Sequence, residues 1–224
     1  MTTRVLGLFA KWPEPGRVKT RLAAGTSSAW AADVALAFLR DLVRRLGVVG
    51  DRRVLAFAPP DARPLFADAV GGSFALVPQQ DGDLGRRLSS FFNDQFAAGA
   101  GSVVVLGTDS PTLPLTFVDQ AFTALAEADM VLGPATDGGY YLVGCRRGVP
   151  PIFDGISWGG STVLAETVAR LANPASRLAL LPPWYDVDTL DDWRMLCGHL
   201  AALRRAGLDP GVPDTEALCQ ASQP

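Results

Sequence analysis

Short apolar segments alternate with longer segments of helical periodicity along almost the whole chain of 224 residues. Strands are expected at residues 4–10, 53–58, 73–77, 102–106, 130–132, 140–145 and 178–181. Helices are expected from a cap at Ser27 or Ser28 to residue 46, and at residues 62–70, 84–98, 114–128, 161–172 and 189–203. This order predicts βαβ units, and therefore a three-layer α/β/α sandwich with a mostly parallel sheet.

The length suits one well-cored domain, which we place at residues 1–206. Residues 207–224 contain Pro and Gly and are expected to form a loosely attached tail. The 48% of hydrophobic residues exclude a mainly disordered chain, and a net charge of -3 argues against nucleic acid as a partner. The first apolar segment is too short to span a membrane. Only 19% of residues are charged, so part of the surface is expected to be apolar or shared in a homodimer.

Cysteine and histidine are too few for several kinds of site. The three cysteines, Cys145, Cys197 and Cys219, offer no CxxC pair and no even set for a disulfide framework. His199 is the only histidine, and it lies in a segment that reads as an ordinary helix. A Cys/His zinc site and a Ser-His-Asp triad are therefore not expected, and the cytoplasm is the default compartment.

The loop after the first predicted strand is rich in cations. Both lysines of the chain lie there, and the loop includes a glycine that lets the backbone approach a ligand: Lys11, Gly16, Arg17, Lys19, Thr20 and Arg21. Lysine gives a compact charge and arginine a bidentate fork, so the loop suits polyphosphate, although a solvated basic loop is the alternative. The GxxxxGK[ST] and GxGxxG motifs are absent, which excludes P-loop kinases and NAD-dependent dehydrogenases.

Two acidic segments follow other strands. Asp109, in the segment Gly107-Thr108-Asp109-Ser110-Pro111, would project from the carboxyl end of a central strand, where α/β sheets bind ligands. Asp186 and Asp188 lie on the same side of an extended segment before the last long helix. Asp109 and Asp188 are the expected ligands of Mg²⁺ or Mn²⁺. Each of these residues could instead cap a helix.

Three further loops are candidates for substrate contacts. The turn at Asp137, Gly138, Gly139 and Tyr140 allows close backbone approach, or is only a hairpin turn. The loop that starts at Gln79 and reaches Gly85 carries amides that could read a base edge. Trp158 could stack on a ligand or simply pack, and Ser161 could cap the next helix.

Four segments together resemble the radical-SAM/selenodomain-associated transferase family. They are Phe9-Ala-Lys11-x-Pro13-x-Pro15-Gly16-x-Val18-Lys19-Thr20-Arg21-Leu22, Gly107-Thr-Asp109-Ser-Pro111, Asp137-Gly-Gly-Tyr-Tyr-Leu and Asp186-Val-Asp188-Thr189. The resemblance covers about residues 4–200 and implies a glycosyltransferase-A-like fold. Lys19-Thr-Arg21-Leu22 is also similar to a signature of phospholactate guanylyltransferases, and Asp109 to the metal-binding Asp of molybdenum-cofactor guanylyltransferases. Asp188 is similar to the metal Asp of sugar-acid cytidylyltransferases, with Leu190-Asp191 in place of Pro-Glu.

These residues lead to three hypotheses. The first is a Mg²⁺-dependent nucleotidyltransferase that joins an NTP-derived nucleotide to a small phosphorylated or phosphonylated acceptor and releases pyrophosphate. In it, Lys19, Arg21 and Asp109 are catalytic, and Lys11, Gly16, Arg17, Thr20, Gln79, Gly85, Thr108 and Ser110 help to bind the nucleotide. The acceptor pocket is formed by Asp137, Gly138, Gly139, Tyr140, Trp158 and Ser161. The second hypothesis is a glycosyltransferase that uses a nucleotide sugar, with Asp137 as a base, and the third is a nucleotide-binding sensor without catalysis.

Overall fold

The computed structural model describes residues 2–171 and 176–221 of the protein. Its seven strands match the predicted ones to within two residues at each end. They are β1 (Thr3–Lys11), β2 (Arg52–Ala58), β3 (Ala75–Pro78), β4 (Ala100–Leu106), β5 (Met130–Pro134), β6 (Tyr140–Arg146) and β7 (Leu178–Leu180). They form one sheet in the order β3-β2-β1-β4-β6-β5-β7. The β6 strand is antiparallel to both of its neighbours and the other pairs are parallel, which confirms the predicted α/β class.

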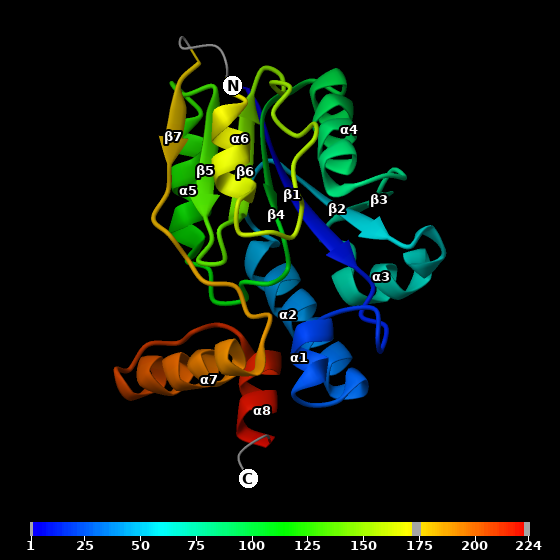
Figure 1. Ribbon diagram of the computed structural model, residues 1–224, viewed down its shortest axis with the longest axis vertical. Helices are drawn as coiled ribbons and strands as arrows, with labels where there is room; N and C mark the ends of the chain where they lie inside the picture. Colours follow the sequence, from blue (N-terminus) through cyan, green and yellow to red (C-terminus); the bar gives the residue numbers. More distant parts are fainter. Residues whose placement is uncertain (1, 172–175, 222–224) are drawn as a thin grey trace.

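Helices cover both faces of this sheet (Figure 1). One face packs against α2 (Ser28–Leu46), α3 (Arg63–Val70), which follows a 3-10 turn at Pro60–Ala62, and α5 (Leu115–Ala124). The opposite face packs against α4 (Leu84–Ala97), and α6 (Val163–Ala169) lies on the same side. Side chains of β1 alternate between the two cores, with Leu6 and Leu8 in one and Val5 in the other. The α2 helix is capped by Ser27, whose side chain accepts a hydrogen bond from the Trp30 N–H.

A third core lies beyond the carboxyl ends of the strands. The short α1 (Thr20–Ala24), the long α7 (Leu190–Arg205) and α8 (Pro213–Ala221) pack there against the first half of α2. Buried side chains from all four helices meet in this core, among them Leu22, Phe38, Trp193 and Cys219. The α7 and α8 helices therefore extend the molecule beyond the sheet and do not cover either of its faces.

The expectation of a loosely attached tail is wrong for residues 207–221. Thr215 in α8 donates hydrogen bonds to the fully buried carboxylate of Asp41 from its backbone N–H, at 2.9 Å, and from its hydroxyl, at 2.7 Å. Two further ion pairs, Arg44 with Asp214 and Arg204 with Glu216, hold the same helix. Residues 222–224 and Ala172, the last residue of the helix predicted at residues 161–172, lie outside the described residues.

The expectation about the cysteines is also corrected, because Cys197 of α7 and Cys219 of α8 form a disulfide. The bond joins two helices that are distant in the chain, and no local sequence pattern signals it. Cys145 is a buried free thiol in β6.

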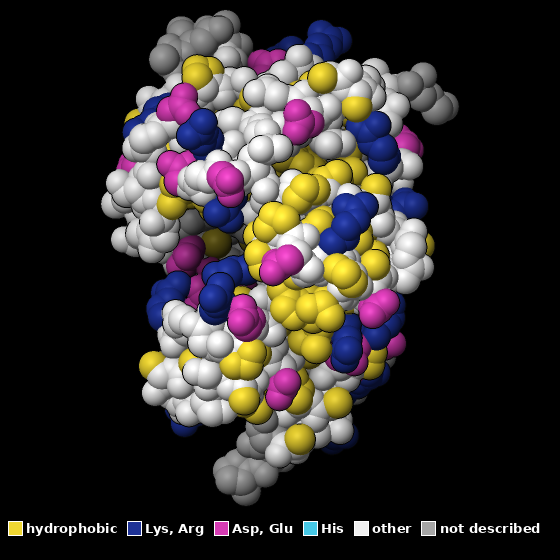
Figure 2. Space-filling view, turned by 90° about the vertical axis from the view of Figure 1, so that its right-hand side faces the viewer, with side chains coloured by type: hydrophobic (Ala, Val, Ile, Leu, Met, Phe, Trp, Pro, Cys, Tyr) yellow, Lys and Arg dark blue, Asp and Glu magenta, His cyan; other side chains and the backbone are white. Residues whose placement is uncertain are grey.

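No helix in the described part of the chain is long and apolar enough to cross a bilayer. Figure 2 turns the α3, β3 and α4 side of the molecule toward the viewer and shows hydrophobic side chains gathered in a patch near its middle. A partly apolar surface agrees with the low content of charged residues. The homodimer stays a prediction.

Candidate functional site

Four loops meet at the carboxyl ends of the parallel strands. They follow β1, β4, β5 and β7, and they carry Lys19, Asp109, Asp137 and Asp188 respectively. Ligands of α/β sheets bind at such an edge because the loops there can diverge and leave a crevice.

Backbone hydrogen bonds tie these loops together. The segment after β7 runs beside the end of β5, where the Trp184 N–H donates to the Pro134 carbonyl at 3.0 Å and the Thr136 N–H donates to the Trp184 carbonyl at 3.1 Å. Three residues later the same segment reaches the loop after β4, and the Val187 N–H donates to the Asp109 carbonyl at 3.0 Å. Asp137, Asp186, Asp188 and Asp109 are brought together by this extended segment.

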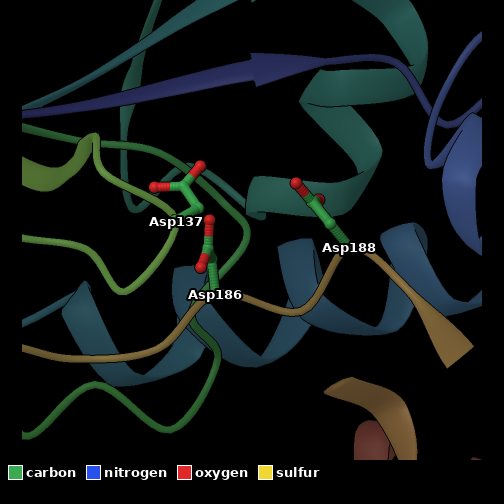
Figure 3. A group of neighbouring side chains, drawn as sticks. All are labelled: Asp137, Asp186 and Asp188. Carbon is green, nitrogen blue, oxygen red and sulfur yellow. The ribbon is translucent and has the colours of Figure 1, made fainter. Parts of the chain in front are cut away.

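Asp137, Asp186 and Asp188, which we call the acidic triad, form a group of carboxylates. One oxygen of each lies within 4.8 Å of one oxygen of the others. Figure 3 shows Asp137 and Asp186 side by side, with Asp188 further along the segment that carries Asp186. Partial burial, followed by repulsion from Asp137, raises the pKa of Asp186 to about 6. A set of converging hard oxygen donors fits Mg²⁺ or Mn²⁺.

Lys19 lies beside the acidic triad as a buried cation. Its backbone is left-handed, with φ 46°, at the start of α1, and its side chain is only 5% exposed. The ammonium donates hydrogen bonds to Asp109, to the Val187 carbonyl at 2.7 Å and to Asp188 at 3.1 Å. Burial alone would lower the pKa of Lys19, but the Asp109 and Asp188 carboxylates outweigh it and the pKa is raised. These contacts bring together three residues that the sequence places in separate loops.

Arg21 contacts the same cluster of charged side chains from its solvent-exposed side. Its guanidinium donates to Asp188 Oδ2 at 2.6 Å and the side chain is 62% exposed. The sequence predicted Asp109 and Asp188 as a pair of metal ligands. In the structure Asp109 pairs with Lys19, and among the described residues the carboxylates that could hold a metal with Asp188 are those of Asp137 and Asp186.

Two adjoining clefts open at this charged group. The first, of about 360 Å³, is lined by Lys11, Arg17, Lys19, Gln79 and Thr108, among others. The second, of about 280 Å³, is lined by Arg21, Ser110, Gly139, Tyr140, Trp158 and the acidic triad, among others. Both share Leu84, Gly107, Asp109 and Asp188. A larger groove of about 810 Å³ lies between α2, α7 and α8, and no residue of the acidic triad lines it.

Several predicted site residues have structural partners. The Gln79 amide donates to the carbonyls of Ala56, at 2.8 Å, and Ala10, at 3.2 Å, so its N–H groups join strand ends and are not free to read a base. Lys11 donates to the Arg17 carbonyl at 2.9 Å, and Arg17 pairs with Glu14 at 3.2 Å. Trp158 packs edge-to-face on Tyr140 with ring centroids 6.3 Å apart.

Other predicted residues do not line either cleft. These are Gly16, Thr20, Gly85, Gly138 and Ser161. A Cβ on Gly85 would lie 2.3 Å from the Phe153 carbonyl, so this glycine permits close packing of α4. Gly138 has φ 93° and packs against the backbone of Ser161, which lets the Asp137 turn fold tightly. Thr162, not Ser161, occupies the cap position of α6.

The sequence did not predict two groups that lie at the acidic triad and Lys19. One is Asp186, which period-two alternation already placed on the same side as Asp188. The other is the Val187 carbonyl, for which no side-chain pattern could have given a signal. Asp137 was expected in the acceptor pocket, and the structure places it in the acidic triad as well as in the second cleft.

The fold and this site can be compared with those of known proteins. No curated protein matches the chain. A solved structure from Desulfovibrio desulfuricans G20, provisionally named nucleotide-diphospho-sugar transferase, is 32% identical, with a TM-score of 0.86 and coverage of 99% of this chain and 98% of that chain. This match confirms the predicted α/β fold with a mostly parallel sheet and shows that it is shared with the nucleotide-diphospho-sugar transferase structure.

Two more distant structures share the fold alone. CMP:2-keto-3-deoxy-manno-octonic acid synthetase, solved with CTP, is 14% identical, with a TM-score of 0.51 and coverage of 92% and 100%. The manganese complex of Rv0371C from Mycobacterium tuberculosis H37Rv is 17% identical, with a TM-score of 0.50 and coverage of 88% and 98%.

A family match identifies the chain more directly. Residues 42–160, more than half of its length, match the family described as uncharacterized protein conserved in bacteria (DUF2064). The matched range contains β2 to β6 and two of the four loops of the site, those with Asp109 and Asp137. The chain therefore belongs to the DUF2064 family.

Proposed function

We propose that this protein is a transferase that moves a nucleotidyl group in the presence of Mg²⁺ or Mn²⁺. The donor is a nucleoside triphosphate, the acceptor is a small phosphorylated or phosphonylated molecule, and pyrophosphate is released. The observation that carries the proposal is the contact of buried Lys19 with Asp109 and Asp188, next to the acidic triad and between two joined clefts.

In this reaction an acceptor oxygen forms a bond to the α-phosphorus while the bond from that phosphorus to the pyrophosphate oxygen breaks. The acceptor phosphate is already a nucleophile, so the chain needs no side-chain base. Lys19 and Arg21 stabilise the negative charge that grows on the phosphates, and Lys11 and Arg17 extend the cationic wall of the first cleft. Asp137, Asp186 and Asp188 would hold a divalent cation, which would supply positive charge against the phosphates.

Known structures support this assignment at a coarser level. The synthetase with the same fold was solved with CTP, and the mycobacterial protein with manganese. Both ligands are of the classes that the cationic loop and the acidic triad suit.

Glycosyl transfer from a nucleotide sugar is the second candidate, because the 32% identical structure carries the name of a nucleotide-diphospho-sugar transferase. In that reaction Asp137 could act as a base toward a sugar hydroxyl.

One assay separates the two reactions. The protein is incubated with Mg²⁺ and each NTP in the presence of pooled small phosphates and phosphonates, and pyrophosphate is measured. Pyrophosphate that forms only with an NTP and an acceptor supports nucleotidyl transfer. Turnover of UDP- or GDP-sugars, with no pyrophosphate from any NTP, rejects it in favour of glycosyl transfer.

A further inference from the structure

Asp188 belongs to two groups of charges at once. Its Oδ1 accepts a hydrogen bond from Lys19 at 3.1 Å, and its Oδ2 accepts one from Arg21 at 2.6 Å. The same carboxylate is a member of the acidic triad. Both of its oxygens are therefore engaged by side-chain cations, although a metal ion at the triad requires one of them.

We propose that Lys19 and Arg21 compete with the divalent cation for Asp188, and that a polyphosphate relieves this competition by drawing the two side chains to itself. The inference rests on the proposed function and adds to it a coupling between the metal site and the phosphate site. The residues that favour the nucleotide then oppose the metal as long as the nucleotide is absent.

The contacts of Lys19 make it the stronger competitor. Its ammonium is buried and is held by Asp109 and by the Val187 carbonyl as well as by Asp188, so it needs no other partner in the free protein. Removing a buried cation from such a pocket leaves carboxylates unpaired, which then attract another cation. Arg21 is mostly exposed, so water screens its pair with Asp188 and its effect is smaller.

Linkage determines how this competition affects the ligands. If a phosphate that binds Lys19 and Arg21 raises the affinity for metal, the metal must raise the affinity for that phosphate by the same factor. Coupling of this kind favours a state in which metal and nucleotide are bound together over states with either alone.

The test is the affinity of the free protein for Mn²⁺, measured without nucleotide by electron paramagnetic resonance and by calorimetry. The variants are Lys19→Met, which keeps the length of the side chain and removes its charge, and Arg21→Gln. Arg17→Gln is the matched control, because it removes the same charge from the same loop but pairs with Glu14 and not with Asp188. Asp186→Asn tests whether the measured ion is bound at the acidic triad.

We expect Lys19→Met to bind Mn²⁺ at least about fivefold more tightly than the parent protein, the lower end of typical coupling between sites. Arg21→Gln should also bind Mn²⁺ more tightly than the parent, by a smaller factor. Arg17→Gln should bind Mn²⁺ as the parent does, and Asp186→Asn should lose it. Unchanged or weaker Mn²⁺ binding in both Lys19→Met and Arg21→Gln overturns the inference, as does an equal gain in Arg17→Gln. Should Lys19→Met fail to fold, Arg21→Gln, whose side chain is at the surface, decides alone.

Failure of the proposed function gives a different pattern. If Mn²⁺ binds equally to the parent and to Asp186→Asn, the acidic triad is not the metal site and both proposals fall. If Mn²⁺ is lost in Asp186→Asn but is not tightened in Lys19→Met or Arg21→Gln, only the competition is rejected, and the pyrophosphate assay still judges the function.

Discussion

Lys19 is buried yet charged, because carboxylates and a carbonyl surround its ammonium group. A single buried lysine of this kind is a structural partner of the acidic residues in the free protein and, in the proposed reaction, a fixed positive charge for the phosphates. Its left-handed backbone, rare for a residue with a side chain, is typical of positions where function outweighs local strain.

Lys19→Ala should lower the rate of pyrophosphate release at least about 100-fold, because a preorganised charge is lost from the transition state. Steady-state kinetics measure the rate, and circular dichroism checks that the fold is kept. Arg194→Ala, which removes an exposed arginine paired with Asp191 on α7, is the control and should keep the rate. A Lys19→Ala protein that turns over at the parent rate removes Lys19 from the mechanism.

Asp186 gives a prediction about pH. Its pKa in the folded protein is raised from 3.8 to about 6, first by burial and then by the neighbouring carboxylates. Between about pH 4 and pH 6 the unfolded chain has lost this proton while the folded protein keeps it, so the contribution of Asp186 to stability falls as pH rises.

Asp186→Asn should therefore gain thermal stability relative to the parent as pH rises from 4 to 7, in the absence of metal. Melting temperatures of both proteins across this range measure the effect. Asp137→Asn should reduce the pH dependence of the parent, since Asp137 is one of the causes of the shift. If the difference in melting temperature between the parent and Asp186→Asn stays constant with pH, the raised pKa of Asp186 is contradicted.

At the scale of elements, α8 shows how a polar side chain fixes a helix that is far away in the chain. Asp41 lies on α2 and is fully buried, and it accepts hydrogen bonds from the first turn of α8 as well as from Arg44. A buried carboxylate without these donors would be strongly unfavourable, and the donors without it would be left unpaired.

Asp41→Ala should lower the free energy of unfolding by about 3 kcal/mol, because it leaves buried donors without an acceptor. Urea denaturation measures this value. Asp33→Ala, at an exposed position of the same helix, is the matched control and should change it by less than about 0.5 kcal/mol. Equal effects of the two substitutions would show that α8 does not depend on Asp41.

At the scale of the whole molecule, the disulfide between Cys197 and Cys219 closes a loop that links α7 to α8. Both helices belong to the third core, and α7 begins directly after the segment that carries Asp186 and Asp188. Cross-linking the chain at these positions lowers the entropy of the unfolded state.

Reduction of this disulfide should lower the free energy of unfolding by about 3 kcal/mol, as expected for a sequence separation of 22 residues. The measurement compares denaturation of the parent with and without a dithiol reductant. Cys197→Ser should resemble the reduced parent and should not respond to the reductant. A parent protein whose stability is the same with and without reductant would contradict the disulfide.

Much of the site was visible before the structure. The cationic loop and Asp109, Asp137 and Asp188 follow strands that local periodicity reveals, and parallel strands bring their carboxyl ends to one edge of a sheet. The glycines and Ser161 were assigned to the ligand because they lie in loops, where glycine also lets the backbone approach closely. These properties do not distinguish a loop that binds a ligand from one that packs, as Gly85 and Gly138 do.

The sequence by itself determined the seven strands, the α/β class and the four loops that form the site, because apolar periodicity is a local property of the chain. Only the tertiary structure decided that β6 lies between β4 and β5, that Asp186 joins Asp137, that Lys19 holds Asp188, and that α8 is packed. Each of these depends on strand register or on side chains many residues apart. Such contacts are selected by the free energy of the assembled molecule and leave no periodic pattern in the sequence.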